Sequence, residues 1–304
     1  MDFLRFLKDI RIPILDEFML MITELGGEIP FLVTAIVVFW CINKRHGYYI
    51  MSVGFLGTII SQFMKLWFRI PRPWVTDPDI ALEAAVGDAG GYSFPSGHSQ
   101  TSVGTFGGLA YITKNKIVRI ICICIAVLVP FSRMYVGVHT PLDVGVGCAL
   151  SLILIFCVRP LVYCEKKNAM PLLIAIMVLV SVAHLCFVEF YPFPADVDAY
   201  NLGHGAENAY TMLGCVLGMI VVYIVDDKWI RFSTDAVWWA QILKVAGGLA
   251  LVMAVKVGMK TPLNLLLGAM AGRAARYFLI VIIAGVIWPL TFKYFKRLGR
   301  NAVQ

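Results

Sequence analysis

The sequence has 304 residues, of which 60% are hydrophobic and only 15% are charged, and its mean hydropathy is +0.80. This composition lies outside the range of soluble globular proteins and predicts a polytopic membrane protein. The formal net charge of +7 does not indicate a nucleic-acid partner, because the basic residues lie in short loops between apolar runs.

The N-terminal segment is amphipathic. Residues 3–25 alternate apolar and charged positions at helical spacing, which predicts a helix that lies in the membrane interface rather than crossing it. The first 28 residues contain no continuous apolar run, so they lack the pattern of a cleavable signal. The eight cysteines of the chain show neither a disulfide framework nor metal-site spacing, and we interpret them as small residues of the apolar segments.

Longer apolar stretches follow this segment, each near the length that crosses the hydrocarbon core of a bilayer. They predict nine spans, of which the first is short and the last is long. The predicted spans cover residues 29–43, 47–68, 97–113, 117–134, 141–163, 170–190, 206–225, 237–257 and 263–293. The expected fold class is therefore all-α, a polytopic transmembrane helical bundle.

The charged loop residues sort to the two sides of this predicted bundle, and the positive-inside rule makes the basic side cytoplasmic. The basic residues of that side are Lys44, Arg45, Lys114, Lys116, Arg119, Arg159, Lys166, Lys167, Lys228, Arg231, Lys293, Lys296, Arg297 and Arg300. The acidic residues of the other side are Asp77, Asp79, Glu83, Asp88, Glu189, Asp196, Asp198 and Glu207. Arg72, His98 and His139 share the acidic side, so we expect a functional site that faces outward from a bacterial cytoplasmic membrane.

The first polar cluster lies at the outer end of the second predicted span, in the stretch KLWFRIPRP that begins at Lys65. Lys65 is nearly two turns inside an apolar helix, where an unpaired ammonium is costly and usually signals function. Arg72 carries a planar guanidinium that suits phosphate oxygens. Snorkelling to the interface is the alternative explanation for such cations and fits Arg69. The irregular connection at 70–92 is the expected substrate entrance.

The second cluster is Ser96-Gly97-His98, at the start of the third predicted span. A Ser-Gly pair at a helix N-terminus directs free backbone N–H groups and the positive end of the helix dipole toward an anion. Gly97 lets the anion approach the backbone, and His98 adds a titratable donor. An ordinary N-cap role for Ser96 would explain most of this pattern on its own.

The third cluster runs from Ser132 to Asp143 and includes Arg133. It predicts a capped helix start, with Thr140 as N-cap, proline at the first helical position and Asp143 three residues after the cap. This turn can bring the carboxylate of Asp143 to the imidazole of His139, which would fix its tautomer and leave the other ring nitrogen free to attack. The stretch alone equally allows that Asp143 only caps the helix.

Together the clusters supply three cations, a helix-end cradle of N–H groups, a serine hydroxyl and two histidines, one of them with a carboxylate partner. This set fits a tetrahedral dianion that is held while one histidine attacks phosphorus and the other protonates the leaving oxygen. No second acidic residue accompanies the clusters to hold a metal, so we expect a reaction without metal or cofactor.

The clusters have the patterns K-x6-R-P, P-S-G-H and S-R-x5-H-x3-D, in this order and each at the end of a predicted span. Residues 29–163 thereby resemble the type 2 phosphatidic acid phosphatase (PAP2) superfamily, which includes lipid phosphate phosphatases. The resemblance implies that His139 is the nucleophile that forms a phosphohistidine, that Asp143 orients it, and that His98 is the general acid. The phosphate-binding residues that it implies are Lys65, Arg72, Ser96, Gly97 and Arg133. The implied partner is a phosphate or diphosphate ester of a membrane lipid.

The amphipathic pattern and the resemblance together predict a division of the chain into three parts. Residues 1–28 are the interfacial helix, residues 29–190 are a PAP2-type catalytic transmembrane core, and residues 191–304 are a C-terminal extension of about three spans. This extension makes the chain longer than a minimal six-helix lipid phosphatase and resembles the arrangement of sphingoid-phosphate phosphatases.

Two stretches of the extension parallel the second and third clusters. Gly203-His204 precedes an apolar span as Gly97-His98 does, and Gly258–Asn264 parallels Gly137–Asp143. A decayed internal repeat would explain both parallels, with lysine in place of the nucleophile and asparagine in place of its carboxylate. Chance similarity between helices rich in small residues is the alternative.

The leading hypothesis is an integral-membrane, metal-independent lipid phosphatase that works at the outer face. A phosphatase for a soluble ester and a lipid phosphotransferase are alternatives, because a phosphohistidine supports transfer as readily as hydrolysis. A transporter or binding protein on the same scaffold would be expected to have lost some of the eight polar residues, and none is lost. The sequence does not name the lipid. Gly247-Gly248 and the Gly268/Gly272 pair permit close helix contacts, either within one chain or in a homo-oligomer.

Overall fold

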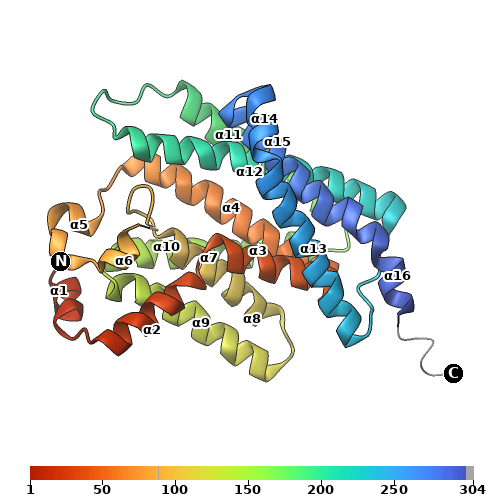
Figure 1. The fold of residues 1–304 in the computed structure, drawn as a ribbon, viewed down its shortest axis with the longest axis horizontal. Coiled ribbons are helices and arrows are strands. Elements are labelled where there is room, and N and C mark those ends of the chain that lie inside the picture. The colour runs from red at the N-terminus through yellow and green to blue at the C-terminus, as the bar shows by residue number, and fades with distance from the viewer. Residues whose placement is uncertain (88, 299–304) are drawn as a thin grey trace. The chain divides into compact units, whose positions relative to one another are not determined.

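The computed structural model describes residues 1–87 and 89–298. Asp88 and Arg300, which the charge pattern assigned to the outer and cytoplasmic sides, lie outside the described residues. Every regular element in the described ranges is a helix (Figure 1). The helices form two compact units. Unit 1 comprises Met1–Leu32, Tyr49–Leu161 and Phe190–Gly205, and unit 2 comprises Val33–Tyr48, Val162–Glu189 and the described residues from Ala206 onward.

Seven of the described helices are long and apolar enough to cross a membrane, and an eighth results if one bent pair near the N-terminus is counted as a single span. The seven are Lys44–Thr76, Lys116–Tyr135, Pro141–Tyr163, Ala169–Phe190, Ala199–Ile230, Trp238–Gly258 and Ala269–Arg297. They confirm the predicted all-α membrane bundle, although the prediction of nine spans was too high.

Part of the difference in the number of spans arises because the predicted span 97–113 is too short to cross a membrane. Residues predicted as the span 97–113 form a continuous helical run made of α7 (Gly97–Ser102), a π-helical turn and α8 (Gly108–Ile112). This run ends at Thr113, whose backbone is extended. It is therefore a short helix that begins at the second polar cluster.

The last membrane-spanning helix begins at Ala269, whereas the apolar pattern predicts a span over 263–293. Gly268 has a φ of +81°, a conformation that glycine adopts without strain. It separates α14 (Lys260–Leu267) from α15 (Ala269–Ile282), which continues through further helical turns to α16 (Phe292–Arg297).

The N-terminal segment forms two helices instead of the single helix predicted over 3–25. They are α1 (Asp2–Asp9) and α2 (Pro13–Glu24), and the chain between them is extended at Ile12. The break follows from Pro13, because a residue before proline avoids the helical conformation and proline itself suits the first helical position. α1 is amphipathic as predicted, and it buries Leu4 and Leu7. After α2 the chain continues into α3 (Glu28–Val37), and these two helices are the bent pair.

In unit 1 the helix α9 (Lys116–Tyr135) packs against α1, α2, α7 and α8. The other helices of this unit are α4 (Lys44–Phe68), α5 (Pro73–Thr76), α6 (Glu83–Val86) and α10 (Pro141–Tyr163). Gly147 on α10 lies so close to the carbonyl of Ser96 that a Cβ atom there would overlap it. The absent side chain therefore lets the first turns of α10 approach the start of α7, which joins the second and third clusters.

Unit 2 contains α11 (Ala169–Phe190), most of α12 (Ala199–Val225), α13 (Trp238–Gly258) and the helices from α14 to α16. Several glycines are close contacts in this unit. A Cβ on Gly248 would overlap the rings of Trp40 and Trp288, and one on Gly272 would overlap the backbone at Leu263. These glycines are used for packing within one chain, so the glycine pattern requires no second protomer.

Candidate active site

The three clusters of the sequence meet in unit 1, at the end where α7 and α10 begin. Lys65 lies near the end of α4, Arg72 directly precedes α5, and Arg133 lies near the end of α9. The backbone N–H of Ser96 donates to the carbonyl of Asp143 at 3.0 Å, which ties the start of α7 to the start of α10. The structure thus gathers residues that are up to 78 positions apart in the chain, from Lys65 to Asp143.

The start of α10 has the predicted cap. The backbone N–H of Thr140 donates to Oδ2 of Asp143 at 2.7 Å, and the N–H of Asp143 donates to Oγ1 of Thr140 at 3.3 Å. Gly137, two residues before His139, has a φ of +79°, and a side chain there would overlap the backbone of Ile80. The turn into α10 is therefore built by a glycine and a reciprocal cap.

Asp143 also lies near His139, the nucleophile predicted from the sequence, and the side chain of Ser93 lies between the two. Nδ1 of His139 is 3.7 Å from Oδ2 of Asp143, which is too long for a direct hydrogen bond. The hydroxyl of Ser93 donates to the same oxygen at 2.7 Å and is 3.4 Å from Nδ1. Ser93 therefore links the imidazole to the carboxylate. Asp143 caps the helix, and this geometry is also compatible with the role of partner to His139 that the sequence presented as the alternative.

The contacts of His139 determine which ring nitrogen carries the proton. Nη1 of Arg72 is 2.7 Å from Nε2 of His139. A guanidinium can only donate, so Nε2 must present its lone pair, and the proton of the neutral ring must lie on Nδ1, toward Ser93 and Asp143. This is the tautomer that a nucleophilic Nε2 requires.

His139 is also held in its neutral form. Burial lowers the pKa of His139 well below its usual value, and the positive charges of Arg72, Arg133 and Lys65 lower it further. Only 1% of the side chain is exposed. The same arrangement that would bind an anion thus keeps Nε2 unprotonated near neutral pH.

Backbone carbonyls of one short loop hold two of the cations. Arg72 donates from Nε to the carbonyl of Gly91 at 3.0 Å and from Nη2 to that of Gly90 at 2.7 Å, and Lys65 donates to the carbonyl of Tyr92. A further bond joins Nη1 of Arg72 to the carbonyl of Val138 at 3.2 Å. Buried and oriented cations of this kind bind an anion without having to be ordered at the moment of binding.

The second cluster forms the expected helix N-terminus, at the start of α7. The side chain of Ser96 caps α7, accepting from the N–H of Ser99 at 3.4 Å and from its hydroxyl at 2.9 Å. Ser96 is therefore an N-cap of α7 through its oxygen, and the role of its own O–H as a donor to phosphate stays a prediction. Gly97 has open space where a Cβ would lie, and His98 is partly exposed. These two residues are therefore the accessible part of the second cluster, and anion binding there stays a prediction.

Arg133 is buried and donates from Nη1 to the hydroxyl of Thr23 on α2 at 2.7 Å. This bond connects the third cluster to the N-terminal helices. The connection at 70–92, predicted to be irregular, contains α5, α6 and a 3₁₀ turn, Pro78–Ile80. Its role as a substrate entrance stays a prediction.

Sequence reasoning missed several residues around the site. Ser93 stands three positions before Ser96, next to a recognised motif, but no spacing rule pairs it with Asp143. Gly90 and Gly91 were treated only as part of a loop. His204 was noted only as a parallel to His98, whereas its ring lies against the backbone of Gly90 and Gly91. Within the described residues, no three His, Cys, Asp or Glu side chains gather in a way that could hold a metal ion.

Known protein families match both halves of the chain. A family model described as the PAP2 superfamily matches residues 45–167, and a model described as a transmembrane extension of PAP2 superfamily phosphatases matches residues 210–300. The first range contains all eight site residues predicted from the sequence. None of the solved structures matches the chain significantly.

Curated relatives are lipid phosphatases by name. Phosphatidylglycerophosphatase B of Bacillus subtilis is 34% identical over 164 residues, which are 49% of this chain and 76% of the relative. Undecaprenyl-diphosphatase of Sulfolobus acidocaldarius is 32% identical over 142 residues, 46% of this chain and 67% of the relative. Sphingosine-1-phosphate phosphatase 1 of Rattus norvegicus is 26% identical over 207 residues, 66% of this chain and 47% of the relative.

The membrane-spanning helices and the matched families define the class of the protein as an integral-membrane phosphoric ester hydrolase. The chain belongs to the PAP2 superfamily, as the motif resemblance predicts.

Proposed function

We propose that this protein hydrolyses a lipid phosphate or diphosphate ester through a phosphohistidine formed on Nε2 of His139. The observation that carries the proposal is the contact between Nε2 and Arg72, which requires a lone pair on Nε2 at the place where a bound phosphate would meet the guanidinium. Ser93 and Asp143 on the Nδ1 side would stabilise the positive charge that the ring gains on attack.

In the first step, Arg72, Lys65 and Arg133 bind the phosphoryl oxygens, and Nε2 of His139 attacks phosphorus. The P–N bond forms as the bond from phosphorus to the lipid oxygen breaks. Burial and the three cations lower the pKa of His98 in the free protein, and the bound phosphate dianion would offset these cations, so that His98 is protonated in the complex and donates that proton to the leaving oxygen. In the second step, water attacks the phosphohistidine and gives its proton to His98. The P–N bond breaks, phosphate leaves, and both histidines return to their starting forms.

We propose that this reaction needs no metal, because the three cations supply the charge that a metal would otherwise bring to the phosphoryl oxygens. The backbone N–H groups at Gly97 and His98 would complete the cradle at the start of α7. Residues 29–190 would form the catalytic core and residues 191–304 its extension, a division that the ranges of the two family models support.

The names of the relatives support a lipid substrate but differ in the lipid: phosphatidylglycerophosphate, undecaprenyl diphosphate and sphingosine 1-phosphate. All three present a terminal phosphoryl group on an amphiphile, and a site near the membrane interface can take such a headgroup without extracting the lipid. The charge pattern of the loops supports a site at the outer face of a bacterial cytoplasmic membrane. Reporter fusions in the 73–93 connection test this orientation, and a cytoplasmic signal there would contradict it.

The test of function is phosphate release by the purified protein from a panel of lipids. The panel contains phosphatidate, phosphatidylglycerophosphate, undecaprenyl diphosphate and sphingosine phosphate, with glucose 6-phosphate as the soluble comparator. We expect release that persists in EDTA and disappears in His139→Ala. Loss of release on adding EDTA would contradict the metal-free route, and preference for the soluble ester would contradict the lipid assignment.

A further inference from the structure

Unit 2 contains two adjoining cavities, lined by residues other than those of the active site. One is a polar cup of about 730 Å³ at the loop between α10 and α11, and the other is an apolar groove of about 670 Å³ between α11 and α12. Pro171 and Tyr223 line both, so the cup and the groove adjoin at these two residues.

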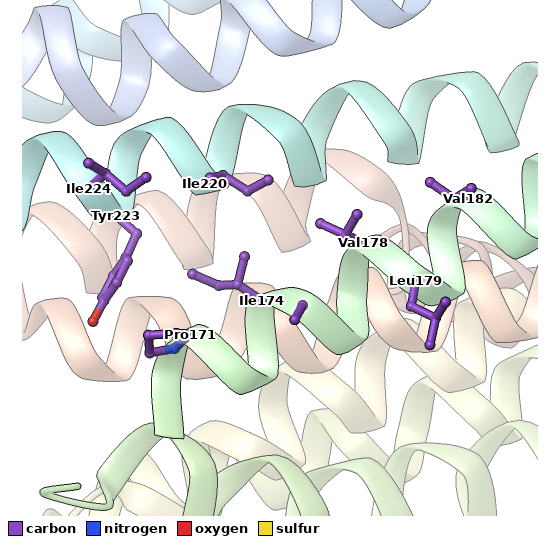
Figure 2. Close-up of a pocket in the computed structure, with 9 residues that line it drawn as sticks. Pro171, Ile174, Val178, Leu179, Val182, Ile220, Tyr223 and Ile224 are labelled. Atoms are coloured by element: carbon purple, nitrogen blue, oxygen red, sulfur yellow. The ribbon is translucent and has the colours of Figure 1, made fainter. Parts of the chain in front are cut away.

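The groove is built for a hydrocarbon chain. Ile174, Val178 and Val182 follow one another at four-residue spacing on α11, and Ile220 and Ile224 have the same spacing on α12. Figure 2 shows these side chains around a common space, into which the ring of Tyr223 extends toward Pro171. Both helices are candidate membrane spans, so the open side of the groove would face lipid rather than water.

The cup carries an excess of free positive charge at the end of this groove. Its basic residues are Lys44, Arg45, Lys166 and Lys167, and its acidic residues are Glu165, Asp226 and Asp227. Lys44 is already paired with Asp226, at 2.8 Å from both carboxylate oxygens. The remaining three cations face two carboxylates, which leaves one net positive charge beside an apolar channel.

We propose that the cup and the groove together bind a bilayer glycerophospholipid of net negative charge. Its phosphodiester headgroup lies in the cup with Arg45, Lys166 and Lys167, and one acyl chain lies in the groove between α11 and α12. The argument for this occupant is that a cationic cup adjoins an apolar groove, so that one amphiphilic molecule can place its charge in the first and a hydrocarbon chain in the second.

The test is native mass spectrometry of the full-length protein, released from detergent micelles that contain phosphatidylglycerol or phosphatidylcholine. We expect one retained phosphatidylglycerol, and about fivefold weaker binding for each charge removed in Arg45→Gln, Lys166→Gln and Lys167→Gln. Ala175→Phe, which fills the groove, should weaken retention without changing any charge. Lys114→Gln/Lys116→Gln removes exposed charges elsewhere and serves as the control.

Equal retention of both lipids by the wild type would overturn the proposal, as would a loss in the control that matches the loss in the cup variants. Unchanged retention in Ala175→Phe would also contradict it, because the acyl chain would then lie elsewhere. The outcome does not depend on turnover, so it stands apart from the proposed catalytic function.

A second observation concerns the active site and rests on the proposed function. The first turns of α12 belong to unit 1, and they cover the loop that holds the cations. A Cβ on Gly90 would be 3.2 Å from Cε1 of His204, and one on Gly91 would be 3.1 Å from Cδ2 of the same ring. Tyr200 stacks on His204 with ring centroids 6.5 Å apart and an interplanar angle of 19°.

We infer that His204 is a positioning residue for Arg72. Its ring lies against the two peptide units whose carbonyls accept from Nε and Nη2 of Arg72, and Nη1 of the same guanidinium contacts His139. The flat ring of His204 can pack directly against this loop because Gly90 and Gly91 have no side chains. The φ of +75° at Gly91 is a second reason for glycine at that position. The C-terminal extension thereby reaches the phosphate site.

The test measures binding of inorganic phosphate by calorimetry in His204→Ala, His204→Phe, Arg72→Lys and the double variant. We expect about tenfold weaker binding in His204→Ala, recovery in His204→Phe because the ring is restored, and a double variant no weaker than Arg72→Lys alone. Full additivity of His204→Ala and Arg72→Lys would overturn the inference. If the wild type does not bind phosphate at all, the proposed function fails instead, so the two failures are distinguishable.

Discussion

Two lysines are buried in apolar helices of this protein, and they have different surroundings. Lys65 in unit 1 donates to a carbonyl of the loop that also holds Arg72, and Arg72 contacts His139. Its positive charge is thus shared with a group of residues that can bind an anion. Only 4% of Lys65 is exposed.

Lys244 in unit 2 is equally buried, with 0% exposed, but it faces no such group. It donates to the carbonyls of Trp40 and Thr234 and lies 4.5 Å from the ring centroid of Phe292. Its bonds join three segments of the unit, and the aromatic ring stabilises the cation. Burial of an ammonium in an apolar helix is therefore not a sign of a site by itself, and the partners of the cation distinguish the two roles.

The buried histidines repeat this comparison. His139 and His184 are 1% and 2% exposed. His139 contacts Arg72 and Ser93, whereas neither ring nitrogen of His184 has a hydrogen-bond partner among the described residues.

Removal of the proposed nucleophile has the largest expected effect. His139→Ala should lower kcat/KM by about 10⁴-fold or more, because the nitrogen proposed to attack phosphorus is lost. His184→Leu is the matched control and should leave kcat/KM unchanged without lowering Tm, since it removes an unsatisfied buried polar group. A comparable loss of kcat/KM in both variants would show that burial of histidine, not its partners, determines activity.

Asp143→Asn comes next, with an expected fall in kcat of about 10³-fold, because a neutral amide cannot stabilise the ring when it becomes positive. Ser93→Ala should cost less, about tenfold, and the two changes should not be additive because they lie in one network. Thr140→Ala removes the cap alone and should lower stability by about 1 kcal/mol with little change in kcat. A loss of kcat in Thr140→Ala equal to that in Asp143→Asn would mean that Asp143 acts only as a cap.

The two buried lysines are compared directly by the same substitution. Lys65→Met should lower kcat/KM by about 10²-fold, because a cation proposed to face the phosphate is lost, and should also lower Tm because the buried carbonyl of Tyr92 loses its donor. Lys244→Met should lower Tm and leave kcat/KM unchanged, because two buried carbonyls lose their donor. An equal loss of kcat/KM in the two variants would contradict the distinction between the two lysines.

The smallest effect concerns pH. The pKa of His139 is lowered by burial and by nearby cations, so the ring stays neutral as the pH falls through 6.5, the usual value of an imidazole. With p-nitrophenyl phosphate, whose leaving group needs no general acid, kcat/KM should stay level through that pH and decline only below it. A decline centred at pH 6.5 or higher would contradict a lowered pKa.

Local patterns predicted the local parts of this structure. The cap of Thr140 and Asp143, the start of α7 at Ser96, and the boundaries of most spans depend on residues a few positions apart, and these predictions are confirmed. The break at Pro13 follows equally local chemistry and was missed because the amphipathic pattern continues across it.

Contacts between distant segments could not be predicted in this way. Ser93 and Asp143 are 50 positions apart, and no periodicity relates His204 to Gly91. The sequence parallel between Gly258–Asn264 and Gly137–Asp143 does not extend to the local structure of the two stretches. Lys260 is the first residue of α14 and Thr261 makes no cap there, whereas Thr140 precedes α10 and caps it. Similar short sequences therefore adopt different local structures when the surrounding contacts differ.

The most direct test of the account is to trap the phosphorylated enzyme. The purified protein is mixed with a lipid phosphate whose terminal phosphoryl group is labelled and whose lipid alcohol is a good leaving group. The reaction is stopped in alkali during turnover. We predict label on His139, formed no more slowly than kcat and absent in His139→Gln. Turnover without label on His139, or label on another residue, would contradict the phosphohistidine mechanism.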